Sequence, residues 1–367
     1  VGTAFERYIA NPLFAWNTSI GQWSNLTDFP VYDLKPERTN SFEVGMNMRF
    51  LKNFELDVTY YNAKTMNQTF NPELPVGEYA RIYIQTGAVR NQGLELALNY
   101  NNTWKDFTWN TGVTYSMNKN KILTLADNAI NPITREKFSI SSLNMGGLGS
   151  TRFILKEGGS MGDIYSLMDL KRDANGAVYI DENNSVVTES LEANNYIKLG
   201  SVLPKGNLAW RNNFSWKNIN VAFLVSARLG GVVFSRTQAV LDNFGVSEAS
   251  AAARDKGYVS VNGNDRVNPE GWYSVVAGGT AVPQYYIYSA TNIRLQEASI
   301  GYTIPRKWLG NVCDIKVSLI GRNLWMIYNK APFDPESVAS TDNFYQGIDY
   351  FMMPSLRNIG FNLSFKF

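Results

Sequence analysis

The sequence of 367 residues contains no histidine and a single cysteine, Cys313. The absence of histidine removes the most frequent general base and metal ligand, and it excludes Ser-His or Cys-His nucleophiles within the chain. A single cysteine excludes an intramolecular disulfide framework. We therefore expect a protein that is not an enzyme and that holds no metal or other cofactor.

Long hydrophobic runs and a strong charge imbalance are missing as well. VAFLV at 221–225 is typical of the longest apolar stretches, far below the ~18 residues of a membrane-spanning helix. The net charge is only +2, which predicts no nucleic acid partner. Yet 44% of the residues are hydrophobic, so the apolar side chains must follow another pattern.

That pattern is an alternation of apolar and polar side chains with a period of two residues. In SLRNIGFNLSFKF, Ile359, Phe361 and Leu363 alternate with polar or small residues. Successive side chains of a strand point to opposite faces, so each such segment has one apolar face. Similar segments lie at 42–50, 54–60, 94–100, 107–117, 208–216, 219–229, 293–304, 315–322 and 357–367. A one-residue slip within 293–304 predicts a β-bulge near Glu297.

These nine or so segments predict an all-β fold, a transmembrane antiparallel β-barrel. Each is close to the ~10 residues with which a tilted strand crosses an outer membrane. In lipid only helices and closed barrels satisfy every backbone hydrogen bond, and the sequence has no helix of that kind. Aromatic residues near the segment ends favour two interfacial girdles. We therefore expect a lipid-facing apolar surface, a polar lumen and a location in the bacterial outer membrane.

The connections between the segments are alternately short and long, with long loops at about 118–206, 234–288 and 329–354. Long loops of outer-membrane barrels face the outside. An odd number of strands does not close a bacterial barrel, and VGTAFERY at the start is no signal peptide. We therefore expect 1–367 to be the C-terminal part of a longer barrel, without its plug and N-terminal strands. Phe367, the last lipid-facing aromatic residue, is expected to be an assembly signal.

Several stretches resemble the SusC/RagA family of outer-membrane TonB-dependent transporters. They include LKPERTNSFEVGMNMRF (34–50), GAVRNQGLELALNY (87–100), TNIRLQEASIGYTIPRKWL (291–309) and VSLIGRNLWMIYNKAPFDPE (317–336). The resemblance implies a 22-stranded barrel around an N-terminal plug, energy from TonB acting through that absent part, and a SusD-like surface lipoprotein as a lid. It also implies import of an oligosaccharide or an oligopeptide, without a choice between them.

Aromatic and basic residues supply the candidate ligand contacts. Flat rings beside Asp and Asn suit sugars or peptides, although such rings also pack loops against each other. Arginines on the lumen face suit anionic groups, although ion pairs with acids of the wall are their more frequent role. The candidates are Trp272, Tyr285, Tyr286, Phe344, Tyr345, Arg228 and Arg322.

Two other functions are compatible with the same wall. A passive porin would conduct ions in planar bilayers without an inner-membrane partner. A structural or adhesion barrel would hold surface ligands without importing them. Measured uptake and its dependence on TonB discriminate these alternatives from active import.

Overall fold

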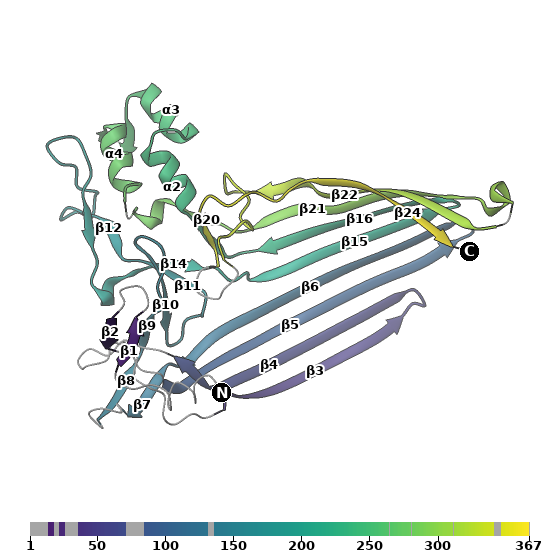
Figure 1. The fold of residues 1–367 in the computed structure, drawn as a ribbon, viewed down its shortest axis with the longest axis horizontal. Coiled ribbons are helices and arrows are strands. Elements are labelled where there is room, and N and C mark those ends of the chain that lie inside the picture. The colour runs from purple at the N-terminus through teal and green to yellow at the C-terminus, as the bar shows by residue number, and fades with distance from the viewer. Residues whose placement is uncertain are drawn as a thin grey trace.

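The computed structural model describes residues 14–17, 22–25, 36–70, 84–130, 136–263, 265–279, 281–310, 312–340 and 346–366. Its largest element is a curved antiparallel sheet of nine strands in the order β24-β22-β21-β16-β15-β6-β5-β4-β3 (Figure 1). The strands are β3 (Arg38–Phe50), β4 (Phe54–Phe70), β5 (Ile84–Trp104), β6 (Phe107–Thr124), β15 (Gly206–Trp216), β16 (Ile219–Leu229), β21 (Asn292–Ile304), β22 (Asp314–Asn329) and β24 (Asn358–Lys366). The predicted all-β class and the predicted strand number are confirmed for the described residues.

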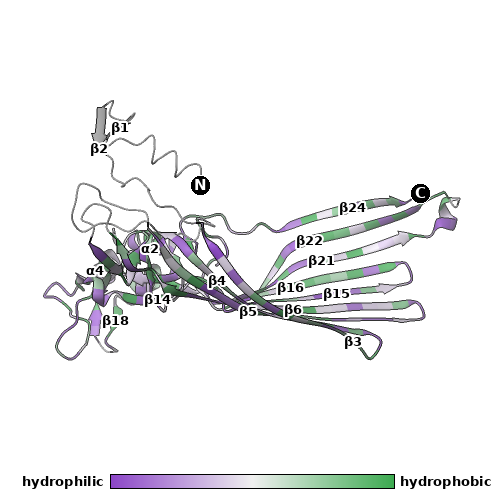
Figure 2. Ribbon diagram, turned by 90° about the horizontal axis from the view of Figure 1, so that it is seen from below, coloured by the Kyte–Doolittle hydropathy of each residue, from purple (hydrophilic) through white to green (hydrophobic). Residues whose placement is uncertain are grey.

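Apolar and polar residues alternate along the strands of the sheet (Figure 2), and the strand pairing places the two kinds on opposite faces. One row across four strands joins Val221 to Ile300, then to Leu319 and finally to Phe361. This outward row is open to the surroundings, with Leu319 55% and Phe361 76% exposed. The opposite, inward face carries polar side chains. The alternation of apolar and polar residues therefore gives each strand one apolar and one polar face, as the sequence predicted.

Rings gather on the outward face at the short-turn end of the sheet. Neighbouring ring centroids there lie 4.7 to 6.5 Å apart, and the rings belong to Phe50, Phe54, Tyr100, Trp104, Phe107, Trp109 and Phe214. The strands are joined at this end by short turns at 51–53, 105–106 and 217–218 and by a segment that contains η3 (Arg306–Leu309). The arrangement matches one of the two predicted aromatic girdles.

Several strands are longer than the sequence predicted. β4, β5 and β6 have 17, 21 and 18 residues, against the ~10 residues that a crossing requires. Along β5, the outward positions change from Leu94 to Gln92 and Arg90 in the direction of the long loops. Apolar residues alternate with polar ones only in the part of a strand that faces lipid. The predicted strands therefore end where the apolar side chains end.

The predicted bulge is present on β21. Leu224 lies opposite Glu297 while Val225 lies opposite Leu295, so Gln296 is the extra residue. β22 is irregular at the same level, where Asn323 has a positive φ of 50°. These irregularities keep the apolar side chains on the outward face on both sides of the bulge.

The long connections fold into a subdomain beyond the other end of the sheet (Figure 1). Its buried core includes Phe153, Ile164, Leu170 and Phe234. The connection after β6 contains β7 (Ala126–Ile130), β8 (Lys137–Ile140), β9 (Ser142–Asn144), β10 (Thr151–Lys156), β11 (Asp163–Ser166), β12 (Met168–Leu170), β13 (Thr188–Ser190), η1 (Ala193–Asn195) and β14 (Ile197–Ser201). The connection after β16 contains β17 (Val232–Ser235), α2 (Arg236–Asn243), α3 (Glu248–Lys256), β18 (Val259–Val261), β19 (Asp265–Val267), α4 (Pro269–Val276), η2 (Pro283–Tyr285) and β20 (Ile287–Ser289). β23 (Ile348–Asp349) belongs to the connection after β22, and β1 (Phe14–Asn17) pairs with β2 (Gln22–Asn25).

The helices of this subdomain begin at capping residues. Ser235, Ser247 and Asn268 accept hydrogen bonds from the first turns of α2, α3 and α4, which satisfies donors that the helix itself leaves free. α3 ends at Gly257, whose φ of 83° suits glycine. Among the described residues, every helix is too short or too polar to cross a membrane.

The connection after β16 leaves and rejoins the sheet at neighbouring points. Gly230 and Gly231 have φ values of 74° and 85°, a backbone conformation that favours glycine. The amide of Ala290 donates to the carbonyl oxygen of Gly231 at 3.0 Å, and the amide of Gly230 donates to Thr291 Oγ1 at 2.9 Å. Both ends of this large connection are therefore fixed to each other where β16 meets β21.

Candidate ligand site at the lumen wall

A polar row crosses the inward face of neighbouring strands near their loop ends. Glu95 on β5 lies opposite Ser116 on β6. Ser116 lies opposite Asn207 on β15, which in turn lies opposite Arg228 on β16. Strands in a sheet are ~4.8 Å apart, so three intervals separate the backbones of Glu95 and Arg228 by about 14 Å. The row therefore carries opposite charges at its two ends.

A hollow of about 720 Å³ lies over this row. A second row lines it, in which Ala97 lies between Asp57 and Thr114. The small alanine side chain leaves space between its polar neighbours. Glu336, from the connection after β22, also lines the hollow. The wall therefore offers carboxylates, hydroxyls, an amide and one guanidinium group to a single space.

The charged groups at the two ends are incompletely paired. Arg228 donates from Nη2 to the carbonyl oxygen of Val202 at 2.7 Å, while its Nε finds no hydrogen-bond partner among the described residues. Asp57 and Glu95 are exposed, and no lysine or arginine in the described ranges forms an ion pair with either. The hollow therefore has the Arg228 guanidinium group at one end, near the Glu336 carboxylate that pairs with Arg294, and two carboxylates without a cation at the other.

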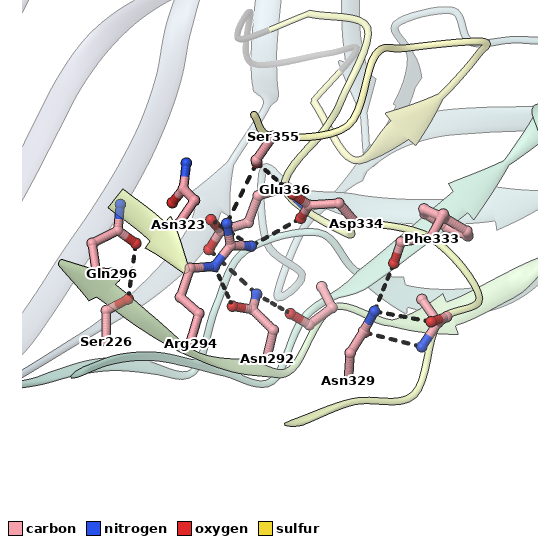
Figure 3. Close-up of polar contacts among 12 residues, drawn as sticks. Ser226, Asn292, Arg294, Gln296, Asn323, Asn329, Phe333, Asp334, Glu336 and Ser355 are labelled. Atoms are coloured by element: carbon pink, nitrogen blue, oxygen red, sulfur yellow. Dashed lines mark hydrogen bonds and ion pairs between the residues drawn. The ribbon is translucent and has the colours of Figure 1, made fainter. Parts of the chain in front are cut away.

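A cluster of polar residues around the buried Arg294 (Figure 3) borders this hollow through Glu336. The arginine is 4% exposed and lies opposite Ser226 on the next strand. Its Nη2 lies 2.9 Å from Asp334 Oδ1 and 3.1 Å from Glu336 Oε2. Ser355 donates a hydrogen bond to the other oxygen of Asp334. We call Arg294, Asp334, Glu336 and Ser355 the arginine clamp, because it ties the connection after β22 to the wall strand β21.

The segment APFDPE positions both carboxylates of the clamp. Asn329, at the end of β22, donates from Nδ2 to the carbonyl oxygens of Ala331 at 2.9 Å and Phe333 at 2.6 Å. Asp334 Oδ1 accepts from the amide of Glu336 at 3.1 Å. The two prolines of the segment restrict φ on either side of Asp334. The clamp is therefore built from a turn with little freedom of its own.

The pH dependence of the clamp follows from Asp334. Burial alone would raise the pKa of its carboxyl group, but hydrogen bonds from Ser355, the Glu336 amide and Arg294 hold the pKa below its ordinary value of 3.8. A depressed folded-state pKa gives stability that is present above the unfolded value and is lost as pH falls through the folded value. We expect the clamp to stay closed at pH 5 and to open only below about pH 3.8. Hydrogen exchange of the Glu336 amide as a function of pH measures this opening, and Asp334→Asn should abolish the acid transition.

The family model described as "TonB dependent receptor-like, beta-barrel" matches residues 1–324. The chain belongs to this receptor family. TonB-dependent receptors of this kind lie in the bacterial outer membrane, so the apolar outward face meets lipid and the long loops are extracellular.

Individual relatives agree with the family. The chain is 26% identical to TonB-dependent receptor P3 of Formosa agariphila over an alignment of 383 positions, gaps included, that covers 93% of this chain and 35% of the relative. It is 27% identical to TonB-dependent receptor P26 of the same organism, over 90% of this chain and 34% of the relative. The chain thus spans about a third of the length of these receptors.

Solved structures share the fold. The RagAB peptide importer in its closed-closed state matches 96% of this chain and 38% of its own chain, with a TM-score of 0.69 and 17% identity. Its open-open state gives a TM-score of 0.66 and 16% identity over the same share of this chain and 37% of its own. The SusC/RagA resemblance predicted from the sequence is therefore confirmed for the fold and for the receptor family.

The predicted ligand residues lie in different surroundings in the structure of the receptor chain. Trp272 of α4 and Tyr285 of η2 lie together in the extracellular subdomain, with ring centroids 5.1 Å apart in an edge-to-face arrangement. Tyr286 is 2% exposed, and its hydroxyl donates to Asp242 at 3.0 Å. Tyr286 therefore packs in the core of the subdomain in this structure.

The remaining predicted residues have different positions. Arg228 lines the lumen hollow, whereas Arg322 pairs with Glu297 at 2.9 Å, the structural role that the sequence favoured for lumen arginines. Phe344, Tyr345 and Phe367 lie outside the described residues. The ligand roles of all seven candidates stay predictions, as does the assembly role of Phe367: Trp272, Tyr285, Tyr286, Phe344, Tyr345, Arg228 and Arg322.

Several residues of the hollow were not singled out from the sequence. Glu95, Ser116 and Asn207 are ordinary polar positions of an alternating strand. Their alignment depends on the register of strands that are far apart in the chain, which no local pattern encodes. The two carboxylates in APFDPE were the one available signal for the clamp, but the pairing with Arg294 joins residues 40 positions apart.

Proposed function

We propose that this chain is part of the wall of an outer-membrane importer driven by TonB, which takes up an oligosaccharide or an oligopeptide. The observation that supports it best is the polar hollow, which lies inside a lipid-facing wall and is bordered by an extracellular loop. A ligand arriving from outside would meet the hollow before it reached the rest of the lumen.

The importer requires parts that complete the wall. β3 and β24 are the edges of the nine-stranded sheet, and unpaired backbone groups at such edges are costly in lipid. We propose that further strands of the receptor pair with both edges, that a plug fills the lumen and couples to TonB, and that a SusD-like lipoprotein covers the extracellular loops. The family resemblance and the RagAB fold support these partners.

The charges of the hollow favour an oligopeptide as cargo. An extended chain advances ~3.3–3.6 Å per residue, so three or four residues would place free termini near Arg228 and near Asp57 and Glu95. Ser116, Asn207 and Thr114 would then meet the peptide backbone. A neutral glycan would use the hydroxyls and amide but leave both charged ends unpaired, at a cost in affinity. Trp272 and Tyr285 of the extracellular subdomain would offer a ring surface to a ligand arriving from outside.

The proposal is tested with the whole receptor, first in cells and then purified. Deleting TonB should abolish uptake of a labelled tripeptide; uptake that continued would contradict active import and favour a porin. In a direct binding measurement, Arg228→Gln should weaken the affinity for the tripeptide about tenfold, as expected for the loss of one hydrogen bond to a charged group. The same change should leave a C-terminally amidated tripeptide unaffected. Arg211→Gln is the matched control on the same wall, and an equal loss there would refute the role of Arg228.

A further inference from the structure

Three cations lie side by side on the outward face of the sheet, just beyond the apolar surface. Lys64 on β4 lies opposite Arg90 on β5, and Arg90 lies opposite Lys121 on β6. We call these three residues the basic ladder. Opposed side chains on one face of a sheet have Cβ atoms about 5 Å apart, and like charges in that position destabilise the pairing.

The depth of the ladder is set by the apolar band beneath it. On β5 the outward band runs from Trp104 to Leu94, which is ten residue steps. At ~3.3 Å per residue and a tilt of 35–45°, ten steps rise about 25 Å, the height of the apolar band of an outer-membrane barrel. Gln92 follows Leu94 on this face and Arg90 comes next. The ladder therefore lies directly outside the hydrocarbon, at the extracellular side.

The ladder has further cations around it and no acidic partner. Lys119 lies opposite Gln92, one outward position closer to the band, and Arg38 of β3 lies one position farther out, opposite Met66. Across the described ranges, none of these five cations takes part in an ion pair or a side-chain hydrogen bond. The Nε of Arg90 is buried and also has no partner.

We propose that the basic ladder binds the phosphate headgroup of a phosphorylated lipid in the outer leaflet. A phosphate presents several acceptor oxygens and at least one negative charge, which removes the repulsion among Lys64, Arg90 and Lys121. Arg90, at the centre of the row, offers the planar donor pair that suits phosphate. The acyl chains of the same lipid would lie on the apolar band below, formed here by Leu94, Tyr60 and Met117.

The position on the wall favours a lipid over other anions. The ladder is on the face that meets lipid, at the level where headgroups begin, and basic residues at that level are attracted to anionic membrane surfaces. A soluble anion would have the charge but would not use the adjoining apolar surface. The lumen hollow faces the other side of the sheet, so this site is independent of the cargo.

The test uses the purified whole receptor in detergent, with a diphosphorylated lipid, the same lipid without phosphate, and inorganic phosphate as probes. We expect the diphosphorylated lipid to bind and to raise the melting temperature. The triple change Lys64→Gln, Arg90→Gln and Lys121→Gln should weaken this binding at least tenfold and remove its dependence on salt. The control triple change Lys171→Gln, Lys256→Gln and Arg266→Gln removes as many exposed charges from the extracellular loops and should leave binding unchanged.

A second readout separates this role from a purely structural one. Without lipid, the ladder variant should melt at a higher temperature than the wild type, because the like-charge contacts are gone; with the diphosphorylated lipid, the order should reverse. Equal lipid binding by the variant and the wild type would overturn the proposal. So would stabilisation by inorganic phosphate equal to that by the lipid, since that result would assign the site to a free anion.

Discussion

Replacing Arg294 by alanine is expected to open the connection after β22, at a cost of about 3–5 kcal/mol in local stability. The side chains of Arg294 and Asp334 are only 5% and 9% exposed. Removing the guanidinium group leaves the Asp334 carboxylate buried beside Glu336 with no cation, and a buried unpaired charge is among the most destabilising changes known. Hydrogen exchange of the amides in 330–340 measures this opening directly.

Arg322 provides the matched control for this change. It also pairs with a carboxylate from the wall, Glu297 at 2.9 Å, but the two side chains are 65% and 41% exposed. Solvent screens such a pair, so Arg322→Ala should cost at most about 1 kcal/mol. Similar exchange rates in the two variants would mean that burial does not strengthen the clamp and that the loop is fixed by other contacts.

Leu319→Arg is expected to impair insertion of the barrel, at a cost of about 2–4 kcal/mol. Leu319 lies on the outward face between Ile300 and Phe361, about halfway up the apolar band. Its neighbour Ile320 is equally aliphatic but points inward, between Ser299 and Gly360. Ile320→Arg should therefore be tolerated within about 1 kcal/mol, since an inward position does not face the hydrocarbon of the membrane.

The two variants are compared by urea titration of the whole receptor folded into lipid vesicles. The two variants place an arginine at adjacent residues of the same strand, so they differ only in the face of the sheet on which the arginine lies. Equal losses for Leu319→Arg and Ile320→Arg would show that arginine disrupts the strand itself, and the assignment of faces would fail. A larger loss for Ile320→Arg would invert that assignment.

The nine wall strands were predictable because lipid imposes a periodic constraint on every outward residue. The same reasoning located the bulge, since one extra residue shifts the phase of all that follow. At Leu319 and Ile320 two aliphatic residues are adjacent, and the phase set by Ile315 and Val317 predicts that Leu319 lies on the apolar face. The pairing with β21 and β24 agrees with this phase.

The candidate site was less predictable because its parts meet through register and loop folding. The row from Glu95 to Arg228 depends on the alignment of four strands, and the clamp joins Arg294 to an aspartate in a distant loop. The outer ends of β4 and β5 were missed for another reason: beyond the lipid, outward positions such as Gln92 and Arg90 carry no apolar signal. Tyr286 was singled out as one of several loop aromatics, although its burial depends on the core that α2 and α4 build around it.

The adjacency of Gly231 and Ala290 at the top of β16 and β21 has a consequence for how such receptors diversify. Because the wall holds the two ends of the intervening segment together, the segment can change without altering the register of the strands beneath it, as long as its core contacts with the connection after β6 are kept. Lineages of these receptors would then acquire new surface specificities by changing these connections together, while the membrane-embedded part changes slowly under the constraint of the lipid.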